Sequence, residues 1–392
     1  MPIELHNPES AERTSRMSSS ESRSARVCMP TARGFTRRAF QCGLYEAQDV
    51  VISTDDVDLL MLEPGPGFCT KMKWQRKLLY RDLTKQLINV NPGIRPVRLQ
   101  QDYELFLVVC QNYWDFLYIN AIEGWKERCR TSVLLIDELW APHLSEYKYW
   151  LHALRQFDHV FVGYAGTAAP LSRAIDYECR WLPGAVDALR FTPAPHCPTR
   201  SIDVYSIGRR FPGVHAALRG LAGAGDFFYV HDTFVGSDMH PSDHREHREL
   251  YANMAKRSRF FMVAPGKMDA RDETGGQVEI GYRYYEGCAA GAILLGQIPE
   301  CDSFYEMFGW ADSVVPIHTD GSDTVAVISE LLAQPQRMHA ISRENTVQAL
   351  LRHDWVYRWR DVYEVAGIPL SQGMLKREAR LKELATSAQA SS

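Results

Sequence analysis

Short apolar runs alternate with stretches of helical periodicity from about Val50 to about Leu332. Each short run has the length of a buried strand, whereas the stretches between repeat apolar residues every three or four positions. The pattern predicts strands at 57–62, 104–109, 132–136, 159–162, 201–208, 226–230, 259–264, 292–296 and 313–317. It predicts helices at 70–90, 213–221, 242–256, 282–290 and 324–332. This alternation is typical of α/β proteins with mostly parallel sheets and helices on both faces.

A proline-rich break at 181–200, WLPGAVDALRFTPAPHCPTR, interrupts the alternation and indicates a connector. We therefore predict two doubly wound, Rossmann-like domains that face each other across a cleft, where ligands of such folds bind. The predicted segments are a flexible tail at 1–39, a first domain at 40–180, a hinge at 181–200, a second domain at 201–350, and C-terminal helices at 351–392 that pack back across the hinge.

Composition is consistent with this organisation and narrows the class of protein. A chain of 392 residues is too long for one ordinary core. A formal net charge of -4 gives no reason to expect nucleic acid or an anionic membrane as partner. Nine scattered cysteines without a CxxC pair favour reduced thiols and a cytoplasmic location over disulfides or a zinc site. No apolar run reaches the roughly 18 residues of a transmembrane helix, and the Ser/Arg/Glu-rich tail lacks a secretory signal, with a transit peptide as the alternative.

Basic residues follow the predicted strands of the second half. Arg209 and Arg210 come after the first of these strands, His231 after the second and Lys267 after the third. The carboxyl ends of parallel strands meet at one edge of the sheet, and guanidinium groups suit forked contacts with phosphate. We expect these residues to bind an anionic ligand, and ordinary surface charges are the alternative.

The stretch Gly281 to Gly296, GYRYYEGCAAGAILLG, carries one acid, Glu286, in a predicted helix. The free N–H groups and positive dipole end of a helix suit a phosphate, and an acid about two turns in can accept hydrogen bonds from ribose hydroxyls. This arrangement indicates a nucleotide diphosphate ligand. A solvated helix acid is the alternative.

Four phrases of the chain together resemble a known family: GQVEIGYRYYEGCAAGAILLG, SIGRR, LPGAVDALRFTP and HDWVYRW. They look like the group 1 glycosyltransferases of GT-B fold, in particular the spore-maturation-type branch, from about residue 181 to 367. The resemblance implies a metal-independent enzyme without a cofactor that moves a sugar from a nucleotide diphosphate donor, bound by the second domain, to an unidentified acceptor on the first. It also implies that Glu286 binds the ribose and Arg209 or Arg210 the diphosphate. The full set of expected donor-binding residues is Arg209, Arg210, His231, Lys267, Gly276, Tyr284 and Glu286.

One position departs from the family pattern. The first acid of the usual Glu-x7-Glu pair would stand at Val278, and Glu279 follows one residue later. Either the loop shifts register and Glu279 contacts the sugar, or backbone amides around Gly275 and Gly276 hold it.

The first half offers candidates for the acceptor side. Asp137 and Glu138 follow the strand at 132–136, and either is expected to orient an acceptor hydroxyl, or to accept its proton if the reaction inverts. The alternative is that Asp137 caps the next helix. In EPGPGF, Gly65 and Gly67 allow close backbone approach to a ligand, with a plain turn as the alternative. We thus expect Asp137 and Glu279 as catalytic residues.

Two other functions stay open. A metal-dependent transferase of the other common fold (GT-A) would use a DxD-like strand end, and STDDVD or LIDELW would serve. A nucleotide-sugar-binding protein without catalysis would also fit the acid missing at Val278. The histidines of HPSDHREH invite a metal site, but polar capping at a helix start explains them better.

Overall fold

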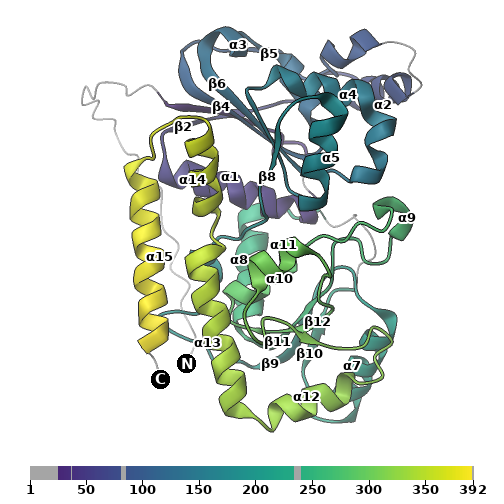
Figure 1. Ribbon diagram of the computed structural model, residues 1–392, viewed down its shortest axis with the longest axis vertical. Coiled ribbons are helices and arrows are strands. Elements are labelled where there is room, and N and C mark those ends of the chain that lie inside the picture. Colours follow the sequence, from purple (N-terminus) through teal and green to yellow (C-terminus); the bar gives the residue numbers. More distant parts are fainter. Residues whose placement is uncertain (1–24, 37, 81–84, 234–239, 391–392) are drawn as a thin grey trace, which may run out of the picture.

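The computed structural model describes residues 25–36, 38–80, 85–233 and 240–390. Two parallel β-sheets form the centres of an upper and a lower domain in Figure 1, and helices cover the faces of both. Every strand pair within the two large sheets is parallel. The predicted α/β class with two doubly wound sheets is confirmed.

The N-terminal sheet has six strands in the order β2-β1-β4-β6-β7-β8. Its long central strands are apolar on both faces, as expected of a parallel sheet covered by helices. The strands are β1 (Val27–Thr31), β2 (Val57–Met61), β4 (Tyr103–Asn112), β6 (Cys129–Glu138), β7 (His159–Val162) and β8 (Cys179–Trp181), with β3 (Val97–Arg98) paired to β5 (Ile122–Glu123) at the side. The helices are α1 (Cys42–Thr54), α2 (Phe68–Tyr80), α3 (Trp125–Arg128), α4 (Lys148–Ala153) and α5 (Ala165–Ile175), with 3-10 turns η1 (Ala39–Gln41), η2 (Lys85–Asn89), η3 (Asp115–Ala121), η4 (Ala141–Tyr147) and η5 (Leu154–Gln156).

Strand β1 corrects the expected tail at 1–39. All five of its residues are buried, and it pairs with both β2 and β4 in the middle of the sheet. Its run VCMPT is short and is flanked by Ser and Arg residues, so the sequence pattern did not separate it from the tail. The rest of the expected tail, at 1–24, lies outside the described residues. The expected helix at 70–90 is also two elements, α2 and η2, with residues 81–84 outside the description.

The C-terminal sheet has five strands in the order β10-β9-β11-β12-β13. Asp243 caps α8 by accepting a hydrogen bond from the Arg245 amide at 2.6 Å, and Pro212 occupies the first turn of α7, where its missing N–H costs nothing. The strands are β9 (Ile202–Ser206), β10 (Tyr229–His231), β11 (Ser258–Val263), β12 (Ile293–Gly296) and β13 (Val315–Pro316). The helices are α6 (Ala188–Phe191), α7 (Pro212–Ala224), α8 (His244–Lys256), α9 (Arg271–Thr274), α10 (Tyr282–Ala289), α11 (Asp302–Phe308), α12 (Thr324–Leu332) and α13 (Pro335–Arg352).

The last two helices, α14 (Trp355–Val365) and α15 (Gln372–Ala390), return to the N-terminal domain. The Trp359 indole N–H donates to the Ala47 carbonyl of α1 at 3.0 Å, and the Tyr363 hydroxyl donates to Asp55 at 2.8 Å. In the connector, Val186 pairs with Asp354 just before α14. In Figure 1, α13 and α15 stand side by side along the left of the molecule, so the C-terminal helices join both domains.

One hydrophobic cluster runs through both domains. It contains the inner face of β1 and α1 on one side, β11 and α10 on the other, and Trp355 and Trp359 between them. The two sheets therefore share a core on the side of α1 and α14, whereas on the other side they meet mainly through polar groups.

Candidate functional site

Each sheet has one point where the strand order reverses. In the N-terminal sheet the chain passes from β1 outward to β2 and then returns to β4, and in the C-terminal sheet it passes from β9 to β10 and returns to β11. At such a point the connections leave neighbouring strands toward opposite faces, and a crevice opens beyond the carboxyl ends of the strands. The structure has a cavity at both points.

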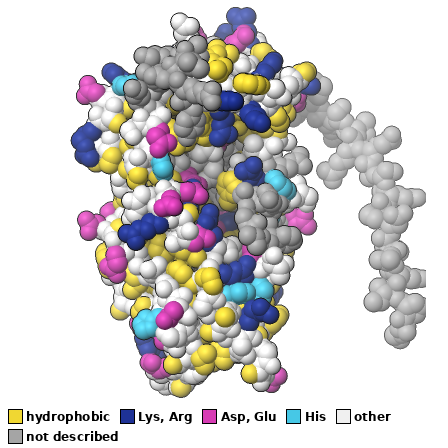
Figure 2. Space-filling model, turned by 90° about the vertical axis from the view of Figure 1, so that its right-hand side faces the viewer, with side chains coloured by type: hydrophobic (Ala, Val, Ile, Leu, Met, Phe, Trp, Pro, Cys, Tyr) yellow, Lys and Arg dark blue, Asp and Glu magenta, His cyan; other side chains and the backbone are white. Residues whose placement is uncertain are grey.

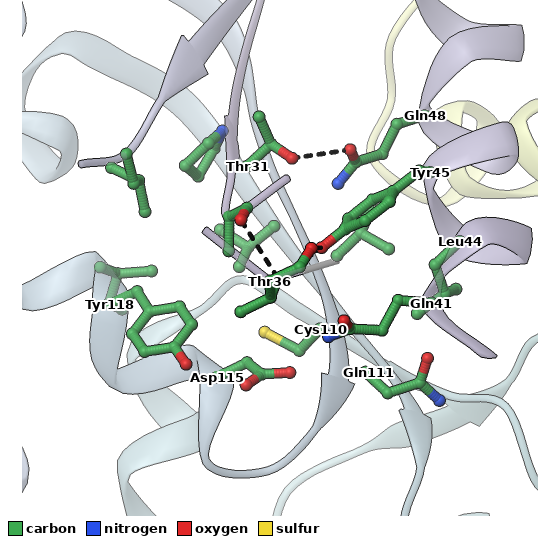
Figure 3. A pocket seen from close by; sticks show the side chains of 16 residues that line it. Thr31, Thr36, Gln41, Leu44, Tyr45, Gln48, Cys110, Gln111, Asp115 and Tyr118 are labelled. Carbon is green, nitrogen blue, oxygen red and sulfur yellow. Dashed lines mark hydrogen bonds between the residues drawn. The ribbon is translucent and has the colours of Figure 1, made fainter. Parts of the chain in front are cut away.

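The N-terminal cavity has a volume of about 40 Å³ and lies between β1, β4, α1 and η3 (Figure 3). Hydroxyl, amide and carboxyl groups line part of it, and apolar side chains line the rest. Thr31 donates to Gln48 Oε1 at 2.9 Å, and the hydroxyls of Thr36 and Tyr45 are 2.5 Å apart. The labelled residues of the wall are Thr31, Thr36, Gln41, Leu44, Tyr45, Gln48, Cys110, Gln111, Asp115 and Tyr118.

Two residues of this cavity have unusual environments. Gln111 is 8% exposed, and its Oε1 has no hydrogen-bond partner among the described residues, while its Nε2 donates to Asp137 at 2.8 Å. Burial raises the pKa of Asp115 to about 6, although the Asn112 amide and the Tyr118 hydroxyl favour its ionised form. A buried acceptor without a donor is costly, so this wall is suited to a ligand with an N–H or O–H group.

The C-terminal cavity, of about 10 Å³, lies at the ends of β9 and β11. Arg209, Arg210 and Arg283 line it beside Ser206. The Ser206 hydroxyl, in a residue 1% exposed, and Arg210 Nη1 are buried and have no hydrogen-bond partner in the described chain. Arg283 donates to the carbonyls of Ile207 and Arg209 at 2.9 and 2.6 Å, which fixes the loop after β9. Cations and two unused donor groups thus meet at one crevice.

Acidic partners hold the two predicted arginines in place. Arg209 pairs with Asp269, and Arg210 pairs with Asp232 and donates to its carbonyl oxygen at 2.8 Å. His231 lies beside this crevice but not on its wall, with its Nδ1 2.8 Å from the Asp232 carbonyl oxygen and its ring against Tyr229 and His215. The strand-end argument therefore brought Arg209 and Arg210 to one cavity and left His231 next to it.

Asp137 lies where the two domains touch. The Tyr282 hydroxyl, from the first turn of α10, donates to Asp137 Oδ1 at 2.5 Å. Burial raises the pKa of Asp137 to about 7, and the hydrogen bonds from Tyr282 and Gln111 only partly offset this effect. Gln111 is bonded to Asp137 and also lines the N-terminal cavity, so it links that cavity to the domain contact.

The loop before α10 docks on the N-terminal domain through Glu279. Its carboxylate accepts hydrogen bonds from the amides of Gly166 at 2.9 Å and Ala165 at 3.2 Å, at the start of α5. Burial raises the pKa of Glu279. The hydrogen bonds from the Gln277 side chain and from these two amides lower it, but by less. Val278, where the family pattern has an acid, is 37% exposed. Gly276 adopts a φ of 84°, and its amide N–H donates to the Thr274 hydroxyl oxygen at 3.2 Å. Glu279 therefore bridges the domains.

Lys267 is a second bridge. Its Nζ is 2.5 Å from Glu138 of β6 and 2.8 Å from Glu273 of its own loop. Burial would lower the pKa of Lys267, but hydrogen bonds to these two acids raise it. Figure 2 shows charged side chains of both signs gathered across the middle of the molecule, where the domains meet.

Glu286 differs from the expectation of an open acid at a helix mouth. It is 4% exposed and pairs with Arg248 of α8, and its Oε2 accepts the Tyr251 hydroxyl at 2.7 Å. Arg248 also binds Glu46 of α1 at 2.8 and 3.0 Å. Burial would lower the pKa of Arg248, but the charges of Glu46 and Glu286 raise it well above its usual value. Both oxygens of Glu286 are engaged in this buried Glu46–Arg248–Glu286 triad.

Tyr284 and the EPGPGF glycines also have structural surroundings. Tyr284 is fully buried against Phe304 and Phe308, and its hydroxyl donates to the Gln297 carbonyl at 2.5 Å. Gly65 donates its amide to the Gly93 carbonyl at 2.8 Å, so a side chain at Gly65 would collide with that oxygen. Gly67 has a φ of 76° at the start of α2. None of these three lines either cavity.

The histidines of HPSDHREH are not arranged around a metal. His244 contacts Asp49 of α1 at 2.9 Å, and His247 stacks on Tyr251. Within the described ranges, no group of three or more His, Cys, Asp or Glu residues could hold a metal ion. The helices described also include none that is long and apolar enough to cross a membrane.

The sequence missed much of the N-terminal cavity. Thr31 and Thr36 fall in the expected tail, Gln41 ends the turn η1, and Tyr45 and Gln48 are on α1, a helix that the pattern did not predict. The run VCMPT before a Gly-containing turn was the one signal for β1. In the C-terminal domain, Ser206 and Arg283 are far apart in sequence. They line one cavity because Arg283 of α10 reaches the loop after β9, which no local pattern indicates.

The comparisons with known proteins agree with this architecture. An α-glucosyltransferase solved with UDP and a 13-mer DNA is 11% identical, with a TM-score of 0.50 over 88% of this chain and 100% of its own. The fold is GT-B. The same type of enzyme with UDP-glucose and DNA containing an abasic site is 10% identical, with a TM-score of 0.51 over 87% of this chain and 99% of its own.

A third solved structure is similar over almost its whole length. The N-terminal domain of trehalose-6-phosphate phosphatase from Candida albicans is 7% identical, with a TM-score of 0.51 over 89% of this chain and 98% of its own. No protein-family model matches the sequence, and no curated protein is significantly similar to it. The GT-B fold with two Rossmann-like domains is therefore established, and the alternative GT-A fold is not observed.

Proposed function

We propose that this protein is a glycosyltransferase that moves a sugar from a nucleotide diphosphate donor to an acceptor on its N-terminal domain, without a metal ion. The observation that carries the proposal is the pair of crevices in a GT-B fold, one with three arginines and unused donors and one whose described wall residues carry hydroxyl, amide and carboxyl groups but no Lys or Arg. Nine free cysteines, five of them buried, support a reducing, cytoplasmic location.

The donor diphosphate would bind at the C-terminal crevice. The Arg210 guanidinium has an unpaired, buried Nη1, and the adjacent Ser206 hydroxyl also lacks a partner in the described residues. Both groups can donate to phosphate oxygens, and three arginines compensate the charge that develops on the leaving diphosphate. Asp232 and Asp269 pair with Arg210 and Arg209, so a diphosphate would have to displace these acids.

Asp137 would accept the proton of the acceptor hydroxyl. Its pKa of about 7 suits proton transfer at neutral pH, and it stands at the contact between the domains, beside Gln111 of the acceptor cavity. The acceptor oxygen would form a bond to the anomeric carbon as the bond from that carbon to the diphosphate breaks. Tyr282 would have to release Asp137 in this step, and Glu279 would keep the loop before α10 on α5.

A binding experiment tests the donor site first. We expect one nucleoside diphosphate in a panel of UDP, GDP, ADP and TDP to raise the melting temperature without manganese, and UDP is the first to try because it is present in a similar structure. Arg210→Ala should weaken binding of that nucleotide about tenfold or more, because a charged hydrogen bond contributes roughly 1.5–3 kcal/mol. The exposed Arg219→Ala on α7 is the matched control.

Turnover separates an enzyme from a binding protein. Release of nucleoside diphosphate with formation of a glycosylated acceptor would support the proposal, and loss of that product in Asp137→Asn with nucleotide binding retained would support the role of Asp137. Nucleotide binding without any product favours the catalytically inactive alternative. If no nucleotide of the panel raises the melting temperature, or if the increase requires manganese, the donor site described above is contradicted.

A further inference from the structure

The groups that line the N-terminal cavity favour one kind of ligand over another, and the GT-B fold alone does not determine which kind. Among the described residues, the 16 that line the cavity include no Lys, Arg or His, and Asp115 carries their one carboxyl group. Figure 3 shows Asp115 and Gln41 on the same lower part of the wall, with Tyr118 beside Asp115. A phosphate or carboxylate placed here would meet the Asp115 carboxylate, and no cation among the described wall residues would compensate it.

Two described arginines near the cavity, Arg33 and Arg76, are already engaged. Arg33 donates to Gln48 Oε1 at 2.7 and 3.2 Å and to Asp49 at 2.7 Å. Arg76, whose charge favours ionised Asp115, lies over the Trp114 ring at 4.1 Å and does not line the cavity. Neither guanidinium is therefore placed to bind an anion in the cavity.

The group without a partner is an acceptor. Gln111 Oε1 is buried and has no donor in the described part of the chain, and the Gln111 side chain is fixed by its bond to Asp137. Asp115 adds a second acceptor on the same wall. A ligand that enters has to bring N–H or O–H groups to satisfy them.

The volume limits what can enter. About 40 Å³ is room for the end of a molecule and not for a whole sugar ring, since one water needs roughly 10–15 Å³ of such space. The cavity wall reaches Asp137 through Gln111, so the remainder of such a molecule would extend toward the domain contact.

We infer that this cavity binds a small hydrogen-bond-donating, non-anionic end of the acceptor, a hydroxyl or a protonated amine, and discriminates against phosphorylated or carboxylated ends. That the ligand is the acceptor rests on the proposed function, whereas the selectivity against anionic groups follows from the cavity itself. It excludes sugar phosphates and sugar acids whose anionic group would enter here.

Small probes of equal size test the charge preference directly. Ethanolamine and ethylene glycol are compared with glycolate by ligand-observed NMR on the full chain saturated with the nucleotide found in the donor panel, or on the ligand-free chain if none binds. We expect the first two to bind at least tenfold more tightly than glycolate. Equal binding of all three, or preference for glycolate, would overturn the inference.

Variants locate the effect. Asp115→Asn should reduce ethanolamine binding at least fivefold and leave the thermal shift by nucleotide unchanged, and Gln41→Leu should reduce binding of both preferred probes. Asp102→Asn, an acid that is 83% exposed on the same domain, is the control. Probe binding that is the same in all three variants would show that the probes bind elsewhere and would overturn the site.

The two proposals fail separately. If nucleotides do not bind but the probes retain their order and their dependence on Asp115, the donor site is wrong and the cavity selectivity stands. If nucleotides bind and turnover occurs with phosphorylated and neutral acceptors alike, the glycosyltransferase proposal stands and the cavity selectivity is wrong.

Discussion

The two domains meet in two regions that use carboxylates in opposite ways. Between α1 and α8, Glu46 and Asp49 face Arg248, Arg245 and His244. Between the loop before α10 and the N-terminal domain, Asp137 and Glu279 meet a tyrosine, an amide side chain and backbone N–H groups. The α1–α8 contact is built from ion pairs. In the second contact Asp137 and Glu279 themselves bond no cation, although the neighbouring Glu138 pairs with Lys267.

This difference predicts different responses to pH. Burial opposes ionisation of Asp49, but the hydrogen bonds from His244 and Arg245 hold its pKa well below the usual range. The pKa values of Asp137 and Glu279 are raised. The α1–α8 contact should therefore persist across neutral pH, whereas the contact near Asp137 changes its charge there.

The largest effect is expected at Arg248. Arg248→Met leaves Glu46 and Glu286, which are 1% and 4% exposed, without their cation, so we expect a loss of about 3–5 kcal/mol in the free energy of unfolding at pH 7. Denaturant unfolding measures it. Arg245→Ala, whose side chain is 59% exposed, should cost less than about 1 kcal/mol.

A compensated variant sharpens this result. Combining Arg248→Met with Glu46→Gln and Glu286→Gln removes all three charges and should recover most of the lost stability. If Arg248→Met is as stable as the parent protein, the triad does not fix the α1–α8 contact.

The next effect concerns pH and Asp137. A carboxyl whose pKa is raised to about 7 on folding holds its proton in the native state after the unfolded chain has lost it, near pH 4. Its contribution to stability is therefore present below about pH 4 and is lost as pH rises to about 7, at up to roughly 1.4 kcal/mol per pH unit. Asp137→Asn should flatten the fall in unfolding free energy between pH 4 and 7. An unchanged slope would mean that Asp137 ionises normally in the native protein.

The smallest effect is expected at Glu279. Glu279→Gln keeps an oxygen for the α5 amides but loses the favourable charge at a helix N-terminus, so we expect a loss of about 0.3–1 kcal/mol at pH 7. Asp272→Asn, an exposed acid of α9 in the same segment, is the control. A loss above that of Arg248→Met would reverse the ranking of the two contacts.

The sequence predicted more of the fold than of the candidate site. Strand runs such as ELFLVV and SVLLI are read from apolar length alone, and β4 and β6 form there. Strand β1 escaped because five apolar or small residues among Ser and Arg carry little signal, although pairing on both sides makes it central.

The site depended on contacts between distant residues. The strand-end rule located Asp137 and Arg210, since it needs only topology. The burial of Glu286 depends on Arg248, 38 residues away, and through it on Glu46 of the other domain, so no local pattern could reveal it. Glu279 likewise shows its partners only when α5 is placed.

The position of α14 and α15 against α1 has a consequence for biosynthesis. The Trp359 indole that covers Ala47 is 312 residues further along the chain, and Val50, Val51, Tyr363 and Met374 belong to the same buried cluster. A ribosome therefore completes both sheets before it releases the residues that cover this face of α1. Until then the nascent N-terminal domain exposes an apolar helix surface, so we expect it to need protection from aggregation during synthesis. We likewise expect C-terminal truncation to impair folding of the N-terminal domain.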